Sequence, residues 1–177
     1  MSVSVSKKAS AYDLSVRLAA PEDAVAVSEL LRTAFDEFKN DYTPEAFHIV
    51  TPPPEEIVAR FNEGPIWAAV LNEKIVGSVS VVPEPEWLYI RSMAVSPDAQ
   101  GRGIGRELLG AVEQHAMESG YDTLFLYTTY FSKDAMRLYK RCGFKHVRDT
   151  TADEWYGTPG LAMEKEISRN KTNVIRS

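Results

Sequence analysis

A glycine-rich turn is the part of this sequence whose residue types and spacing best fit a chemical task. Segment 100–105 reads Gln-Gly-Arg-Gly-Ile-Gly, with glycines at alternate positions. Because glycine has no side chain, successive backbone N–H groups of such a turn can point into one concavity. A helix is predicted directly after the turn, and its positive N-terminal end would open onto that concavity. The pattern favours anion binding, with Arg102 and Arg106 adding positive charge; the alternative is a tight connection without a ligand.

The helix after the turn is indicated by apolar residues with helical spacing and by Gly120 as a stop. These apolar residues are Ile104, Leu108, Leu109, Val112 and Ala116. Spacing excludes two other phosphate-binding patterns. The sequence contains no Gly-x-x-x-x-Gly-Lys-Ser/Thr segment, and the dinucleotide pattern fails because Arg106 stands where its third glycine is needed.

A tyrosine on a later predicted helix could take part in proton transfer. Ser132 is expected to cap this helix and Gly143 to end it. Its inner face carries residues at positions i, i+3, i+4 and i+7, which are Ala135, Leu138, Tyr139 and Cys142. A phenol with a pKa near ~10 stays protonated at neutral pH and can donate a proton or a hydrogen bond. The alternative for Tyr139 is a core aromatic, and Cys142 is expected to be a small buried hydrophobe.

Both segments together resemble the GCN5-related N-acetyltransferases, the GNAT family. Segment 100–105 follows a strand ending in Met-Ala-Val-Ser-Pro and resembles the family's acetyl-CoA pyrophosphate motif, Arg/Gln-x-x-Gly-x-Gly/Ala. Segment 132–144 resembles the second family motif, Asn-x-x-Ala-x-x-x-Tyr-x-x-x-Gly-Phe, with Ser132 in place of the asparagine. The two motifs occur in the family's order, separated by a predicted helix and strand.

The resemblance implies an acetyl-CoA-dependent N-acetyltransferase. Its acyltransferase reaction would move the acetyl group to a primary amine of a small molecule or peptide, by direct attack in a ternary complex. Tyr139 would be the catalytic residue, the acid that meets the departing CoA sulfur. The residues assigned to cofactor binding are Met93, Ala94, Val95, Gln100, Gly101, Arg102, Gly103, Ile104, Gly105, Arg106, Ser132 and Tyr139. A non-catalytic acetyl-CoA-binding sensor, another acyl donor and an alcohol acceptor remain open.

The acceptor side is less sharply defined by the sequence. Segment 37–51 lacks helical periodicity, is interpreted as irregular and carries the aromatic residues Phe38, Tyr42, Phe47 and His48. By resemblance it forms a wall of the acceptor pocket; the alternative is that its rings anchor a loop to the core. Segment 153–156 is also interpreted as irregular, carries aromatic residues and lies outside the donor motif, so we expect it to help select the acceptor. No general base is singled out. Candidates by position are Glu86, Asp153 and Glu154, each also readable as a surface carboxylate, and a water chain is equally open.

Composition limits the class of protein further. With 177 residues and 44% apolar content the chain can bury one sizeable core, so we expect one domain at 12–167, between a flexible tail at 1–11 and a polar tail at 168–177. The net charge of −5 argues against nucleic acid and anionic membranes, and weakly favours a cationic small molecule or basic peptide. One cysteine and scattered histidines imply neither an internal disulfide nor a metal. A cytoplasmic location is expected, and a homodimer is left open.

The predicted elements alternate between strands and helices. A strand is expected at 12–18, a helix after Pro21, a short helix after the prolines 52–54, a hairpin at 66–82, and strands at 88–95, 122–129, 144–148 and 161–167. In the strand at 88–95 the apolar residues change parity, which predicts a β-bulge near Arg91 and Ser92. The fold class is α/β (α+β mixed). We expect a six- or seven-stranded, mostly antiparallel sheet with a central parallel pair and flanking helices, the acyl-CoA N-acyltransferase fold.

Overall fold

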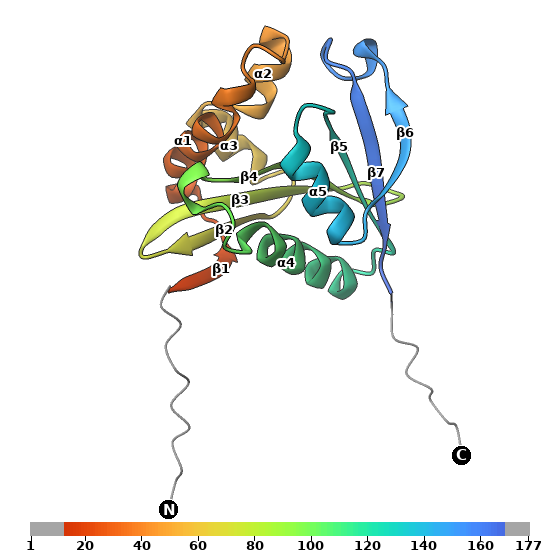
Figure 1. The fold of residues 1–177 in the computed structure, drawn as a ribbon. Helices are drawn as coiled ribbons and strands as arrows, with labels where there is room; N and C mark the ends of the chain where they lie inside the picture. The colour runs from red at the N-terminus through yellow and green to blue at the C-terminus, as the bar shows by residue number, and fades with distance from the viewer. Residues whose placement is uncertain (1–12, 169–177) are drawn as a thin grey trace, which may run out of the picture.

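A computed structural model describes residues 13–168 of the chain. Seven strands form one sheet in the order β1-β2-β3-β4-β5-β7-β6 (Figure 1). The strands are β1 Leu14–Leu18, β2 Ile66–Leu71, β3 Lys74–Pro83, β4 Leu88–Val95, β5 Thr123–Thr128, β6 Lys145–Thr150 and β7 Gly160–Glu166. The α-helices are α1 Ala24–Phe35, α2 Pro44–Val50, α3 Pro54–Arg60, α4 Ile104–Glu118 and α5 Lys133–Arg141. The expected tails lie outside the described residues, apart from Ser168.

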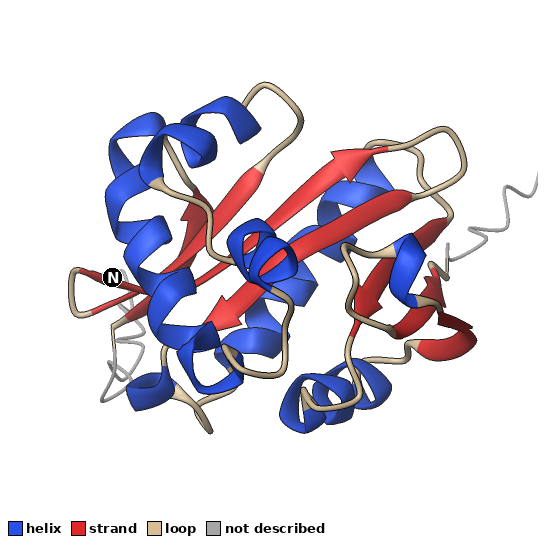
Figure 2. Cartoon of the chain, turned by 90° about the horizontal axis from the view of Figure 1, so that it is seen from above, coloured by secondary structure: helices blue, strands red, loops and turns tan. Residues whose placement is uncertain are grey.

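Helices cover both faces of the sheet (Figures 1 and 2). Neighbouring strand residues point to opposite faces, and Ile66 and Trp67 accordingly belong to different hydrophobic clusters. Ile66 packs with residues of α1 and α3, whereas Trp67 packs with residues of α4. The five apolar residues predicted for the inner face of α4 are all buried. No helix within residues 13–168 is long and apolar enough to cross a membrane.

Among the strands of residues 13–168, the one parallel pair is β4 and β5, at the centre of the sheet. Their ladder runs from Leu88↔Leu124 to Ile90↔Leu126 and ends there, although β4 continues to Val95. On the other side of β4, Ser80 pairs with Arg91 but Ser78 pairs with Ala94, so β4 holds one extra residue. Ser92 has a φ of 50°. The predicted bulge is confirmed, and it separates the end of β4 from β5.

The segment predicted to be irregular is in part helical, so that interpretation of 37–51 was wrong. Thr43 Oγ1 accepts a hydrogen bond from Ala46 N at 3.2 Å, and Pro44 occupies the first turn of α2. A threonine cap followed by proline is a recognised helix start, but seven residues are too few to show a clear period. The next helix, α3, was predicted, and Val58 on it faces away from the core. Its side chain is 45% exposed, whereas the preceding Ile57 is buried.

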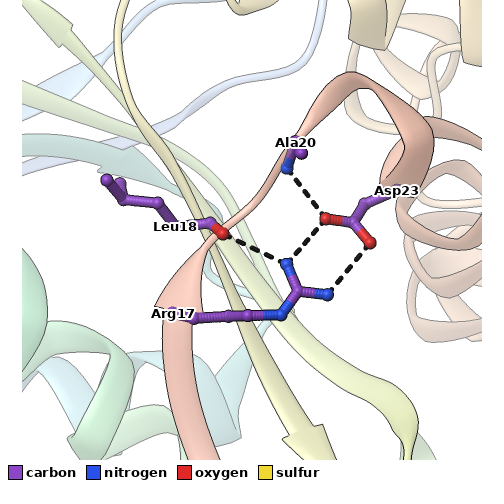
Figure 3. Close-up of polar contacts among 4 residues, drawn as sticks. All are labelled: Arg17, Leu18, Ala20 and Asp23. Atoms are coloured by element: carbon purple, nitrogen blue, oxygen red, sulfur yellow. Dashed lines mark hydrogen bonds and ion pairs between the residues drawn. The ribbon is translucent and has the colours of Figure 1, made fainter.

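A polar cluster ties the end of β1 to the start of the first helical region (Figure 3). Asp23 accepts two hydrogen bonds from the Arg17 guanidinium, at 2.7 and 3.0 Å, and one from Ala20 N at 2.8 Å. The bonds from Arg17 are the main cause of a lowered pKa of Asp23. This cluster lies outside the cavity described below, so it fixes a chain connection and not the site.

Within residues 13–168 the outer strand β6 pairs with β7 alone, and it carries several charged residues. Five of its six residues, from Lys145 to Asp149, are exposed, and its pairing with β7 shifts register between His146 and Arg148. The strand is therefore bent at Val147, which is 48% exposed.

Candidate active site

A cavity of about 1080 Å³ opens where β4 and β5 diverge. Its walls come from α1, both ends of α2, the end of α3, the divergent strands, α5 and the connection between β6 and β7. Two groups of polar side chains line it. The Tyr139 group comprises Tyr42, Thr129, Ser132 and Tyr139, and the Arg60 group comprises Arg60, Tyr89, Arg91 and Ser92.

Tyr139 is buried, as expected for a core aromatic, and it also lines the cavity, where a proton donor would have to lie. Its ring packs edge-on against Phe144, with ring centroids 5.7 Å apart. Burial is the main cause of a raised pKa of its phenol, and the neighbouring Tyr42 contributes in the same direction. The phenol therefore stays protonated across the neutral range and can act as a donor.

Ser132 stands directly before α5 but does not cap it with its side chain, contrary to expectation. Its hydroxyl lies 2.7 Å from Thr129 Oγ1, and both side chains are buried. A hydroxyl can donate one bond and accept others, so this pair can still offer polar atoms to the cavity. Tyr42, which is also buried, belongs to the same group, and burial raises the pKa of its phenol.

The glycine turn lies at the start of α4 and does not line the cavity. Gly101 and Gly103 have φ values of 79° and 76°, and the space that a Cβ would occupy is open at both. Gly105 has a different role, because a Cβ there would lie 2.6 Å from Leu138 of α5. The side chain of Ile104 is buried in the core, so only its backbone could face a ligand.

The other predicted turn residues, Gln100, Arg102 and Arg106, are exposed. An exposed pair of arginines beside open backbone at a helix N-terminus fits a phosphate group.

The three predicted residues of the bulged strand have different surroundings. Met93 lines the cavity. Ala94 and Val95 pair with Ser78 and Gly77 of β3 and lie outside the lining. Because the β4–β5 ladder ends before them, the edge of these residues toward β5 is free of ladder pairing. The strand can therefore offer backbone groups to a ligand that lies between β4 and β5.

The two segments expected to surround an acceptor do meet, but not all their aromatic residues line the cavity. Thr43 N donates a hydrogen bond to Thr158 Oγ1 at 3.1 Å, and Thr43 Oγ1 donates one to the carbonyl of Tyr156. Trp155 and Tyr156 line the cavity. Phe47 lies outside the lining and packs against the hydrophobic cluster of Tyr42, Ala46 and Val50, with its ring centroid 6.4 Å from that of Tyr42. For Phe47 the alternative of a core anchor holds.

The carboxylates considered as bases differ in position. Asp153 and Glu154 lie exposed at the cavity wall, whereas Glu86 lies outside the lining. Glu154 accepts hydrogen bonds from Thr151 N at 2.7 Å and from Arg148 at 2.6 Å. The bond from Thr151 is the main cause of a lowered pKa of Glu154, and the bond from Arg148 acts in the same direction. A lower pKa makes Glu154 a weaker base.

Sequence reasoning missed the Arg60 group. Arg60 is 8% exposed, and its guanidinium donates to Ser92 Oγ and to the carbonyl of Ile49, both at 2.8 Å. Arg91 forms an ion pair with Glu63, with 2.5 Å between Nη2 and Oε2. An arginine at the end of a short helix is usually solvated, so no local pattern in the sequence distinguishes Arg60.

The fold is that of the acyl-CoA N-acyltransferases. The PaiA N-acetyltransferase of Thermoplasma acidophilum, solved with coenzyme A, superposes with a TM-score of 0.74 at 18% identity, over 86% of this chain and 98% of that one. The yncA protein of Salmonella typhimurium, solved with acetyl-CoA, gives 0.70 at 16% identity, over 89% and 95%.

The sequence model described as "Acetyltransferase (GNAT) family" matches residues 26–144, and the chain belongs to this family. The N-acetylaspartate synthetase of Xenopus tropicalis is 37% identical over 83 residues, which cover 46% of this chain and 31% of that protein. The chain thus spans less than half the length of relatives such as this one.

Proposed function

We propose that this protein is an acetyl-CoA-dependent N-acetyltransferase that acts on a primary amine of a small molecule or peptide. The observation that carries the proposal is the divergence of β4 from β5 onto a cavity lined by the protonated phenol of Tyr139. Membership of the GNAT family and the likeness to a neighbour solved with coenzyme A support it. The relative named as an N-acetylaspartate synthetase supports a small acceptor.

The residues that would hold acetyl-CoA form what we call the donor side, which includes residues of the cavity wall and the glycine turn outside its lining. The turn 100–105 would hold the pyrophosphate, with Arg102 and Arg106 beside it. The backbone of 93–95 would bind the pantetheine arm along its free edge, and Ser132 would offer one hydrogen bond. The open space over Gly101 and Gly103 fits this assignment. When bound, acetyl-CoA supplies an activated acetyl thioester.

The protein's own contribution is to orient the two reactants and to supply one proton. Holding an amine and a thioester in one cavity removes much of the entropic cost of their encounter. Tyr139 would donate its phenolic proton, or a strong hydrogen bond, to the departing sulfur. A group with a raised pKa suits this role, because it carries its proton throughout the neutral range.

The test is turnover of acetyl-CoA by the full chain. The protein is mixed with acetyl-CoA and a panel of primary amines, free thiol is measured, and products are weighed by mass spectrometry. Thiol release that depends on the amine, with acetylated product, is the expected result. Tight acetyl-CoA binding without turnover of any amine would overturn the proposal in favour of a non-catalytic sensor.

A further inference from the structure

We propose that the acceptor carries a carboxylate a few bonds from its amine, and that Arg60 binds this carboxylate inside the cavity. The inference rests on the proposed function and names the substrate class for the same site. It would make the protein an acetyltransferase for a small amino acid or a related amino-carboxylate.

The first support is the surroundings of the Arg60 guanidinium. Its two hydrogen-bond acceptors, Ser92 Oγ and the carbonyl of Ile49, are both uncharged. They occupy two of the five N–H donors of an arginine. Among the ion pairs of residues 13–168, none includes Arg60. A buried cation of this kind is costly unless an anion joins it.

The second support is the charge balance around Arg60. The nearest carboxylates that influence its pKa are Glu63 and Glu56. Glu63 is engaged by Arg91 and Glu56 by His48, whose ring nitrogen lies 2.9 Å away. Burial lowers the pKa of Arg60, and the charge of Arg91 acts in the same direction. An arginine nevertheless stays charged in proteins, so Arg60 and Arg91 both carry a positive charge here, while Glu63 and Glu56 each already have another partner.

The third support is the position of Arg60 relative to the proposed donor side. Its guanidinium bonds to Ser92, the bulge residue with positive φ, and the next residue, Met93, begins the backbone stretch proposed to bind the cofactor arm. A carboxylate on Arg60 would therefore lie beside the thioester. Only an acceptor with a short distance between its carboxylate and its amine could bind to both points.

The remaining walls fit a small organic molecule. Tyr89 and Trp155 line the cavity near the arginines, and burial raises the pKa of Tyr89 to about 12. Tyr89 is therefore an uncharged donor at neutral pH and does not compete with the carboxylate for Arg60. Aromatic side chains with a few placed polar groups are typical of small-ligand sites.

The reaction itself stays balanced with such an acceptor. The neutral amine nitrogen forms a bond to the acetyl carbon, and the carbon–sulfur bond breaks. One N–H proton is lost and one S–H bond forms, which gives an N-acetyl amino-carboxylate and CoA thiol. The carboxylate is unchanged and serves only to position the amine.

The experiment compares matched acceptors on the full chain. Each free amino acid of a panel is paired with its carboxamide and with the amine that lacks the carboxyl group. For the preferred amino acid, wild-type kcat/KM should exceed that of both partners by at least ~10-fold, which corresponds to about 1.4 kcal/mol. A preference for the carboxamide, or equal rates, would overturn the inference without touching the proposed N-acetyltransferase function.

Two variants of Arg60 and one control variant locate the effect. Arg60→Gln should lower kcat/KM for the amino acid by about 10-fold or more and leave the carboxamide within about two-fold. Arg60→Lys, which keeps the charge but loses the fork of donors, should lie between Gln and wild type. Arg32→Gln removes an exposed arginine of α1 and should change neither acceptor. Equal losses for amino acid and carboxamide would mean that Arg60 only supports the bulge.

Binding measurements distinguish this inference from a role of Arg60 in cofactor binding and from the proposed enzyme activity. The acetyl-CoA dissociation constant of Arg60→Gln should stay within about two-fold of wild type; a parallel loss would assign Arg60 to a cofactor phosphate and overturn the inference. A short carboxylic acid without an amine should raise the melting temperature of wild type and not of Arg60→Gln. If this holds while no amine is turned over, the carboxylate site stands and the proposed enzyme activity fails. If Arg60→Gln does not fold, the wild-type acceptor comparison decides.

Discussion

The proposed donor side and the proposed acceptor side, which comprises Arg60, Tyr89 and Trp155, are built from different parts of the polypeptide. The donor side is mostly backbone, with a glycine turn at a helix start and a strand edge freed from its neighbour. The acceptor side is mostly side chains that arrive from α3, β4 and the connection before β7. Backbone groups are the same for every residue type, so they suit the proposed donor acetyl-CoA, which is the same whatever the acceptor. Side chains set size, charge and shape, so they suit the reactant that gives specificity.

The largest expected effect concerns Tyr139, for which we propose a role in proton transfer. Tyr139→Phe keeps the ring against Phe144 and removes only the hydroxyl. We expect kcat to fall by about 10²-fold or more, the scale of general acid catalysis, with little change in the acetyl-CoA dissociation constant. Pre-steady-state kinetics must show that chemistry limits the rate. A Phe variant that then turns over like wild type would remove Tyr139 from the mechanism.

The next effect tests whether the donor side binds through its backbone. In Gly103→Asp, a carboxylate would project into the open space beside the turn, and we expect acetyl-CoA binding to weaken by about 10-fold or more by calorimetry. Gly103→Asn is the matched control, because asparagine has the same shape and tolerates positive φ as well but carries no charge. If both variants lose affinity equally, strain or bulk is responsible and not repulsion of a phosphate.

On the acceptor side, two aromatic residues with different positions give a matched pair. Trp155→Ala changes the cavity wall, so we expect KM or kcat/KM for the amine to change several-fold while the acetyl-CoA dissociation constant stays within about two-fold. Phe47→Ala changes a hydrophobic cluster behind the wall, so we expect a lower melting temperature and a smaller effect on the amine. A larger effect of Phe47→Ala than of Trp155→Ala on the kinetics of the amine would show that Phe47, and not Trp155, belongs to the acceptor wall.

The smallest effect concerns a cluster that belongs to neither side. The lowered pKa of Asp23 means that its contribution to stability is present above the unfolded-state pKa of about 3.9 and is lost as the pH falls through the folded-state value. We expect Asp23→Asn to lower the melting temperature by a few degrees at pH 7 and by less at acidic pH, with unchanged kinetics. A difference in melting temperature that grows as the pH falls would contradict this assignment.

Sequence reasoning was most successful where a pattern extends over many residues. The fifteen residues of α4 show their period clearly, and the change of parity along β4 predicted the bulge correctly. It failed at α2, where seven residues cannot display a period, and at Phe47, whose aromatic type suits both a core and a pocket. It could not find Arg60, because a guanidinium becomes a site residue only when distant segments bury it beside Ser92.

The exposed edge of β6 has a consequence for how the protein behaves at high concentration. A free strand edge can recruit a strand of another molecule and start aggregation. In β6, lysine, histidine, arginine and aspartate side chains crowd this edge, and the bend at Val147 interrupts the straight row of N–H and C=O groups that an incoming strand would need. We therefore expect this edge to resist sheet-to-sheet growth during expression and storage.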